Sequence, residues 1–119
     1  MGGSRAIPLP AHVAIETVAA PAIMAAPFVL GFGQAAGVVS FAIGALLLGL
    51  AVQAAGPRRS IPLSAHAGFD YLLAAAAAIS GLLIGFATGE WGAGSFLVGI
   101  GVAMATLTAA TRFSVPVGA

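Results

Sequence analysis

The sequence predicts an all-α integral membrane protein whose four transmembrane helices form an up-down-up-down bundle. Of the 119 residues, 61% are hydrophobic and 6% are charged, whereas an ordinary soluble domain is roughly 25% charged. Four apolar stretches are long enough to cross a hydrocarbon core of about 30 Å, which takes about 20 helical residues. The short, turn-rich connectors predict antiparallel neighbours in a single membrane domain. The expected helices are residues 11–32, 35–55, 65–87 and 92–110.

The charged residues predict how the bundle is oriented. The same side of the bundle receives all four arginines, Arg5, Arg58, Arg59 and Arg112, and positively charged residues near membrane segments stay on the cytoplasmic side. The other side carries Glu90, which we expect to be an exposed turn carboxylate. We therefore expect a protein of the inner (cytoplasmic) membrane with both termini in the cytoplasm.

Composition and motifs argue against several classes of function. The formal net charge is +1 and lysine is absent, so the chain has no basic patch for binding nucleic acid. The absence of cysteine rules out disulfides and thiolate metal sites. No phosphate-binding loop, nucleophile elbow or dinucleotide fingerprint is present. We therefore expect a protein that is not an enzyme.

An internal repeat divides the chain into two helical hairpins. Residues 7–16 read IPLPAHVAIE and residues 61–70 read IPLSAHAGFD, so the repeats are expected at about 5–56 and 59–112. A one-residue insertion then aligns the Ser-Phe-Ala-Ile-Gly at 40–44 with the Ser-Phe-Leu-Val-Gly at 95–99. Because each unit crosses the membrane an even number of times, the sequence predicts a pseudo-two-fold axis along the membrane normal.

The end of the first expected helix points to a family. Residues 26–32 read APFVLGF, followed by a short loop and a glycine-rich helix. This stretch resembles the SPW-repeat family of bacterial integral membrane proteins, whose unit is a helical hairpin with a Ser-Pro-Trp motif. Pro27 keeps the proline of that motif and Ser80 keeps the serine in the second copy, while the other motif positions differ. The resemblance implies a small multi-pass membrane protein and no particular biochemical activity.

The repeated phrase places a histidine four residues before a carboxylate in each copy. On a helix this spacing puts His12 beside Glu16, and His66 beside Asp70. A structural reading is that both pairs stabilise helix starts and hairpin packing. If the two pairs instead face the bundle axis, they could form an N2O2 metal site or supply two axial haem ligands. Proton or ion movement is the third reading.

Small residues and prolines predict features of helix packing. Small side chains spaced four apart let helices approach closely, and we expect them to seal the bundle, with dimerisation as the alternative. These residues are Ser40, Gly44, Gly81, Gly85, Ser95 and Gly99. Pro21 and Pro27 each remove a backbone donor from the first helix and are expected to kink it.

These observations leave three hypotheses for function. The first is a non-enzymatic module for packing or interaction in the lipid bilayer, as a homo-oligomer or within a larger membrane complex. The second is a small transporter or proton-coupled channel, and the third is a metal- or haem-binding membrane protein. The last two would both use His12, Glu16, His66 and Asp70, and the sequence assigns no particular cofactor.

Overall fold

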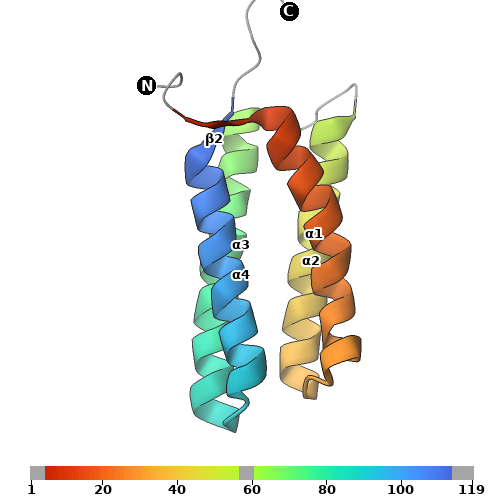
Figure 1. Ribbon diagram of the computed structural model, residues 1–119, viewed down its shortest axis with the longest axis vertical. Coiled ribbons are helices and arrows are strands. Elements are labelled where there is room, and N and C mark those ends of the chain that lie inside the picture. Colours follow the sequence, from red (N-terminus) through yellow and green to blue (C-terminus); the bar gives the residue numbers. More distant parts are fainter. Residues whose placement is uncertain (1–4, 57–60, 114–119) are drawn as a thin grey trace, which may run out of the picture.

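The computed structural model describes residues 5–56 and 61–113, and almost all of them belong to four helices (Figure 1). Every one of these helices is long and apolar enough to cross a membrane, which confirms the all-helical, four-span prediction. In Figure 1 the chain runs down one helix and up the next, twice over. The helices are α1 (Leu9–Leu30), α2 (Gln34–Ala55), α3 (Leu63–Thr88) and α4 (Trp91–Ala110).

Prolines and glycines set the helix boundaries. Both α1 and α3 begin directly after a proline, Pro8 and Pro62, which is consistent with proline's fixed φ and missing N–H at a helix start. These starts lie two residues earlier than the sequence predicted. At the other end, α1 and α3 are capped by Gly31 and Gly89 with φ of 69° and 76°, a left-handed conformation that favours glycine.

The four helices pack as two hairpins. Helix α1 packs mainly against α2, and α3 mainly against α4, while α2 and α3 form the larger contact between the hairpins. One group of buried apolar residues lies midway along the bundle and includes side chains of both hairpins: Ala20, Ile23, Ile43, Leu47 and Ala77. A second group, nearer the α1–α2 and α3–α4 turns, joins α2 to α3 and α4: Ala36, Ile84, Ala93 and Leu97.

Close approach of α1 and α2 depends on two small residues of α2. The Ser40 hydroxyl is fully buried and donates a hydrogen bond of 2.8 Å to the Ile23 carbonyl of α1. A Cβ atom added at Gly44 would lie 2.8 Å from the Ala20 carbonyl oxygen, which is too close for any side chain. Both residues therefore lie in the α1–α2 contact.

The contact between α3 and α4 is also built on glycine. A Cβ added at Gly81 would lie 2.5 Å from the Gly94 carbonyl oxygen, and one added at Gly101 would lie 2.5 Å from the Ala74 carbonyl oxygen. Gly85 lies directly against the Trp91 ring. The glycines of the two helices therefore allow backbone to meet backbone.

The expectation for Ser95 and Gly99 is corrected. Both residues lie on the outer surface of α4, and a Cβ added at Gly99 would meet nothing within 4 Å. Gly94 and Gly101 face α3 instead. The one-residue insertion in the repeat alignment therefore assigned the packing face of α4 to the wrong residues.

Pro21 and Pro27 lie inside α1, and the helix continues through both to Leu30.

Two short strands close one end of the bundle. Strand β1 (Ile7–Pro8) pairs in parallel with β2 (Thr111–Arg112), in a register that places Ile7 opposite Thr111. The Arg5 guanidinium donates a hydrogen bond of 3.3 Å to the Thr111 carbonyl oxygen. The segments before α1 and after α4 are thus joined beside the first turns of α1 and α3 (Figure 1).

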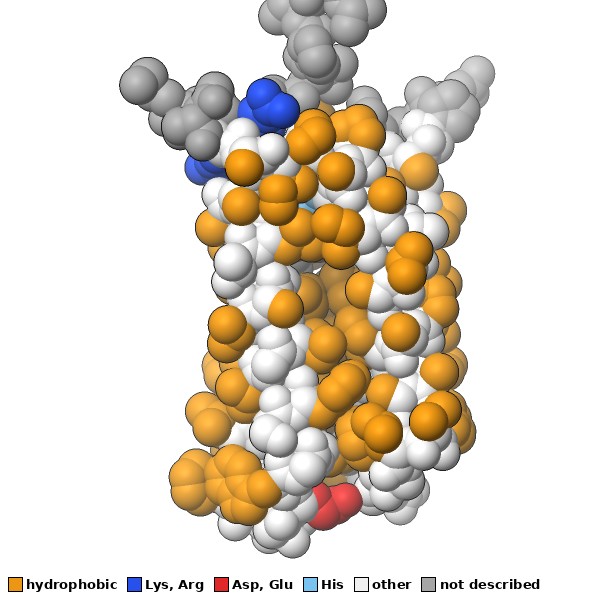
Figure 2. All heavy atoms as spheres, viewed as in Figure 1, with side chains coloured by type: hydrophobic (Ala, Val, Ile, Leu, Met, Phe, Trp, Pro, Cys, Tyr) orange, Lys and Arg blue, Asp and Glu red, His pale blue; other side chains and the backbone are white. Residues whose placement is uncertain are grey.

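The two ends of the bundle differ in charge. In Figure 2 arginine side chains lie at one end, an acidic side chain lies at the opposite end, and hydrophobic side chains cover the face between them. Arg5 and Arg112 lie at the end with the strands. The expectation for Arg58 and Arg59 lies outside the described residues.

Glu90 at the opposite end does more than was predicted for an exposed turn carboxylate. It is half-buried directly before α4, and its Oε1 accepts a hydrogen bond of 2.8 Å from the Gly33 backbone N–H. Gly33 lies in the turn between α1 and α2. Glu90 therefore links the two hairpin turns.

Candidate metal centre

Four ionisable side chains converge between α1 and α3. His12 and Glu16 come from α1, and His66 and Asp70 come from α3; one ligand atom of each lies within 4.8 Å of those of all the others. The chain has two histidines and three acidic residues in total, so this cluster holds all of them except Glu90. We call these four residues the His-carboxylate cluster.

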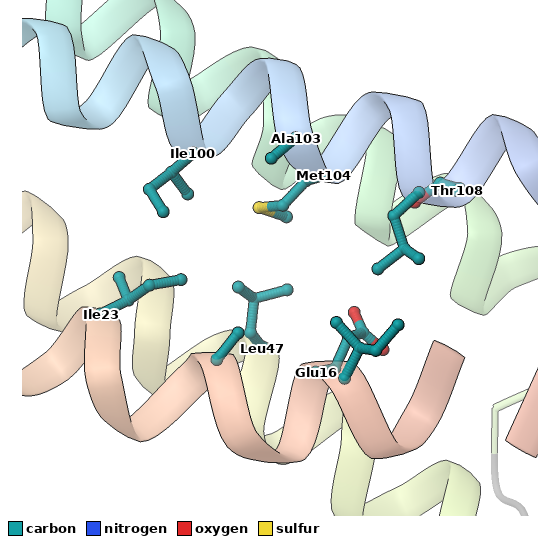
Figure 3. Close-up of a pocket in the computed structure, with 10 residues that line it drawn as sticks. Glu16, Ile23, Leu47, Ile100, Ala103, Met104 and Thr108 are labelled. Atoms are coloured by element: carbon teal, nitrogen blue, oxygen red, sulfur yellow. The ribbon is translucent and has the colours of Figure 1, made fainter. Parts of the chain in front are cut away.

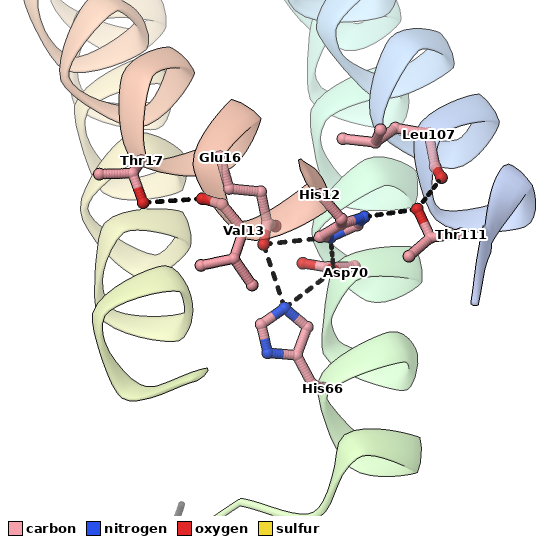
Figure 4. Close-up of polar contacts among 8 residues, drawn as sticks. All are labelled: His12, Val13, Glu16, Thr17, His66, Asp70, Leu107 and Thr111. Atoms are coloured by element: carbon pink, nitrogen blue, oxygen red, sulfur yellow. Dashed lines mark hydrogen bonds and ion pairs between the residues drawn. The ribbon is translucent and has the colours of Figure 1, made fainter. Parts of the chain in front are cut away.

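Each imidazole of the His-carboxylate cluster contacts both carboxylates (Figure 4). His12 Nε2 lies 2.9 Å from Asp70 Oδ2 and 3.1 Å from Glu16 Oε1. His66 Nε2 lies 3.1 Å from each of the same two oxygens. The pairs predicted within each helix are therefore present, and they are also joined across the two helices.

The fold explains why the two pairs meet. Helices α1 and α3 start at the same end of the bundle and run in the same direction (Figure 1). His12 and His66 are each the fourth residue of their helix, so both pairs lie at similar depth. Spacing of four residues keeps each carboxylate on the same face as its histidine, and these faces point toward each other.

Thr111 of β2 determines which nitrogen of His12 carries a proton. Its hydroxyl donates to the Leu107 carbonyl at 2.6 Å, and the same oxygen lies 2.8 Å from His12 Nδ1. A threonine hydroxyl has a single proton, which the Leu107 carbonyl accepts. His12 Nδ1 must therefore be the donor in its contact with Thr111.

This assignment places a requirement on His12 Nε2. With a proton on Nδ1, the neutral ring has a bare lone pair on Nε2. That lone pair would point at two carboxylate oxygens 2.9 and 3.1 Å away, which is repulsive. A proton or a cation must therefore lie between these atoms: a proton on Nε2 or on a carboxylate oxygen, or a cation bound by all of them.

The His-carboxylate cluster is closed off from water. The exposed fraction is 0% for His12 and Asp70, 1% for His66 and 5% for Glu16. The Phe113 ring covers both imidazoles, with centroid distances of 5.0 Å to His12 and 5.8 Å to His66. Buried charges are costly unless they are paired or bind a metal, so this burial demands compensation inside the cluster.

A cavity of about 160 Å³ lies beside the cluster, between α1, α2 and α4 (Figure 3). Glu16 lies at one end of it with Thr108. The remaining lining residues are apolar: Ile15, Ala19, Ile23, Leu47, Ile100, Ala103, Met104 and Leu107. Glu16 is thus the member of the cluster that adjoins open space.

Two buried polar atoms of the cluster have no hydrogen-bond partner among the described residues. They are His66 Nδ1 and Asp70 Oδ1. Such atoms are rare in folded proteins and call for an explanation. Asp70 Oδ2 contacts both imidazoles, whereas Oδ1 keeps lone pairs that a bound cation could use.

The ligand set fits a divalent first-row metal better than haem. Two imidazoles and two carboxylates suit zinc, iron or manganese. A haem held between the two imidazoles would occupy the space of the Glu16 and Asp70 oxygens, which lie within 3.1 Å of both Nε2 atoms. The haem alternative therefore has no room in this arrangement.

Sequence reasoning found the four residues of the His-carboxylate cluster and missed the residues that surround them. Thr111 and Phe113 follow α4 and belong to no motif, so nothing in the sequence linked them to His12. The one available signal was that a hydroxyl and an aromatic ring follow the last apolar stretch at the arginine-rich end.

In comparisons with known proteins, no family model, curated sequence or solved structure matches the chain.

Proposed function

We propose that this protein is a non-enzymatic integral membrane protein in which a divalent transition-metal ion joins two helical hairpins at the His-carboxylate cluster. The observation that carries the proposal is the convergence of two imidazole nitrogens and two carboxylate oxygens within 4.8 Å, with all four residues buried. Because α1 belongs to one hairpin and α3 to the other, an ion held here would tie the hairpins together.

Charge and size both support a divalent ion. Two neutral imidazoles and two carboxylates carry a charge of −2, which a divalent cation neutralises. Metal–ligand distances of about 2.0 to 2.1 Å place tetrahedral ligands about 3.3 to 3.4 Å apart. The four nitrogen–oxygen distances are 2.9 to 3.1 Å, and all four ligand atoms lie within 4.8 Å of one another, so movements of the side chains alone would bring them to tetrahedral positions.

The closed shell favours a structural ion over a catalytic one. Catalytic zinc sites keep a position for water or substrate, whereas structural sites take four protein ligands. Here four ligands are present, and the most exposed of them, Glu16, is 5% exposed. This supports a module for packing or interaction whose hairpins are held together by metal.

A transporter or proton-coupled channel that uses the same four residues is the alternative. The cavity beside Glu16 supports it, because that cavity adjoins the cluster. Against it, Thr108 is the other polar residue among the lining side chains, and a charge moving through apolar surroundings in a membrane is strongly disfavoured. We therefore place metal binding first.

Several finer proposals accompany this function. The arginines at one end support an inner-membrane protein with cytoplasmic termini. The matched pairs His12/Glu16 and His66/Asp70 support two parallel repeats related by a pseudo-two-fold axis, and membership in the SPW-repeat family remains our proposal. Ser95 and Gly99 are exposed on α4, which supports their alternative role in homo-oligomer contacts or in a larger membrane complex.

Metal binding is tested with the protein purified in mild detergent and stripped with a chelator. Zinc is added and counted by elemental analysis, and cobalt serves as an optical probe of the ligand shell. We expect one ion per chain and, at a zinc concentration 100 times Kd, an increase of about 2.7 kcal/mol in the free energy of unfolding. The chelator should reverse that gain.

The variant Asp70→Asn removes one ligand charge while keeping the shape of the side chain. Replacing a residue that only hydrogen-bonds to a metal ligand already lowers metal affinity about 10 to 100-fold. Asp70 would be a ligand itself, so we expect Asp70→Asn to lower zinc affinity at least about 100-fold. Glu90→Gln is the matched control, because Glu90 is the remaining acidic residue and lies at the other end of the bundle. Wild-type protein that binds neither zinc nor cobalt, or equal binding by Asp70→Asn, would overturn the proposal.

A further inference from the structure

We propose that Thr111 is a positioning residue of the metal site, which holds His12 as the tautomer that directs the Nε2 lone pair at the ion. Through Thr111, ion binding would also be coupled to the docking of β2. This inference rests on the proposed function, since it concerns a metal bound at the same four ligands.

The first support is the direction of the hydrogen bonds around Thr111. Its hydroxyl proton is used by the Leu107 carbonyl at 2.6 Å, which leaves its oxygen to accept from His12 Nδ1 at 2.8 Å. Metal-bound histidines commonly donate their other ring N–H to such an acceptor, which fixes the tautomer and the ring orientation. Thr111 supplies that acceptor for His12.

The second support is that Thr111 is itself held in place. Its exposed fraction is 0%, it pairs with Ile7 in the strand register, and its carbonyl oxygen accepts from Arg5 at 3.3 Å. A residue whose backbone is held from two directions positions its side chain more strictly than a residue on a free loop does. The orientation of His12 therefore depends on the contact between β1 and β2.

The third support is the difference between the two histidines. His66 Nδ1 has no partner among the residues that the structure describes, whereas His12 Nδ1 has Thr111. The two imidazoles thus have different surroundings although their Nε2 atoms contact the same two oxygens. Removing the Thr111 hydroxyl should consequently change His12 and leave His66 as it was.

The surroundings of the cluster also indicate that an ion entering from water passes β2. The cavity on one side is almost wholly apolar, and a bare cation there would lose its hydration. The side facing the arginine-bearing end is covered by Thr111 and by the Phe113 ring. An aqueous ion would therefore reach the ligands when β2 and Phe113 move aside.

The test compares zinc affinity in three variants of the full chain, measured by competition with a chromophoric chelator. Thr111→Val removes the hydroxyl at nearly constant shape, and Thr111→Ser keeps it. Thr106→Val is the matched control, because Thr106 makes the same kind of bond to a carbonyl four residues earlier, at 2.8 Å, on the exposed side of α4. We expect a 10 to 100-fold loss for Thr111→Val, near-complete recovery for Thr111→Ser and no change for Thr106→Val.

A spectroscopic readout separates positioning from a general loss of stability. In zinc-bound protein labelled with 15N-histidine, we expect wild-type His12 to show a protonated Nδ1 and a metal-bound Nε2. In Thr111→Val the Nδ1–H signal of His12 should shift or exchange faster with water, while the His66 signals stay in place. The zinc dissociation rate should also increase in this variant, because β2 is held less firmly.

The outcomes distinguish this inference from the proposed function. If the wild-type protein binds no zinc, both fail. If the wild-type binds zinc, and Thr111→Val binds it with unchanged affinity and an unchanged His12 spectrum, the positioning role is wrong while the metal site stands. An equal loss of affinity in Thr111→Ser would likewise overturn the role of the hydroxyl.

Discussion

Two glycine-to-alanine substitutions in the same hairpin should change stability in opposite directions. A Cβ added at Gly81 of α3 would lie 2.5 Å from the Gly94 carbonyl oxygen and 2.9 Å from the Val98 backbone nitrogen. Ordinary contact begins near 3.4 Å. Because both neighbours are backbone atoms that cannot rotate away, α3 and α4 would have to separate by several tenths of an ångström.

The size of the effect follows from two opposing contributions. Overpacking costs typically about 1 to 3 kcal/mol, and replacing glycine by alanine inside a helix contributes about 0.5 to 1 kcal/mol. Because the 2.5 Å contact is far inside ordinary contact, we place Gly81→Ala in the upper half of the overpacking range and expect it to lower the free energy of unfolding by about 1 to 2.5 kcal/mol. At Gly99 an added Cβ meets nothing within 4 Å, so Gly99→Ala should raise it by about 0.5 to 1 kcal/mol.

The free energy of unfolding can be measured by titrating detergent-solubilised protein with sodium dodecyl sulfate and following helix content. The single tryptophan, Trp91, gives an independent signal, because its ring packs against Gly85 of α3. A stabilising Gly81→Ala, or a Gly99→Ala as harmful as Gly81→Ala, would refute the assignment of packing faces on α3 and α4.

Two further predictions concern hydrogen bonds that join helices. Ser40→Ala removes the buried hydrogen bond to the Ile23 carbonyl. It should lower the free energy of unfolding by about 0.6 kcal/mol, and by at most about 1.7 kcal/mol. An unchanged free energy in the same titration would contradict the role of this hydrogen bond. Glu90→Ala removes the acceptor for the Gly33 N–H and should cost about 1 kcal/mol, whereas Glu90→Gln keeps an acceptor and should lose less. Hydrogen exchange at Gly33 should become faster in Glu90→Ala than in the wild type, and a rate that Glu90→Ala leaves unchanged would show that the carboxylate does not hold the turn.

The sequence predicted the helices well because their signals are local. Apolar stretches of about 20 residues indicate membrane-spanning helices, whatever the rest of the chain contains. The four-residue spacing of His12 and Glu16, and of His66 and Asp70, likewise follows from helix geometry alone. What required the structure was the cross-contact, such as His12 Nε2 to Asp70 Oδ2 at 2.9 Å, because it depends on how two hairpins rotate toward each other.

The errors have the same physical origin. Ser95 and Gly99 resemble Ser40 and Gly44 in the sequence, but a single-residue shift turns a helix by about 100° and moves them to the outer face. Glu90 was predicted to be exposed because its partner is a backbone N–H in another turn, which no side-chain pattern reveals. Contacts between distant segments therefore decided each of these positions.

The strand pair also has a consequence for the order in which the protein is made. His12 and Thr111 are 99 residues apart in the chain, and at about 5 to 20 residues per second the ribosome needs about 5 to 20 seconds to make the residues between them. For most of that interval α1 is complete, and His12 has no hydroxyl to hold its ring. A nascent chain that has released α3 but not yet β2 would carry all four residues of the His-carboxylate cluster with His12 only loosely oriented, so the cluster reaches its final form only after β2 has been made.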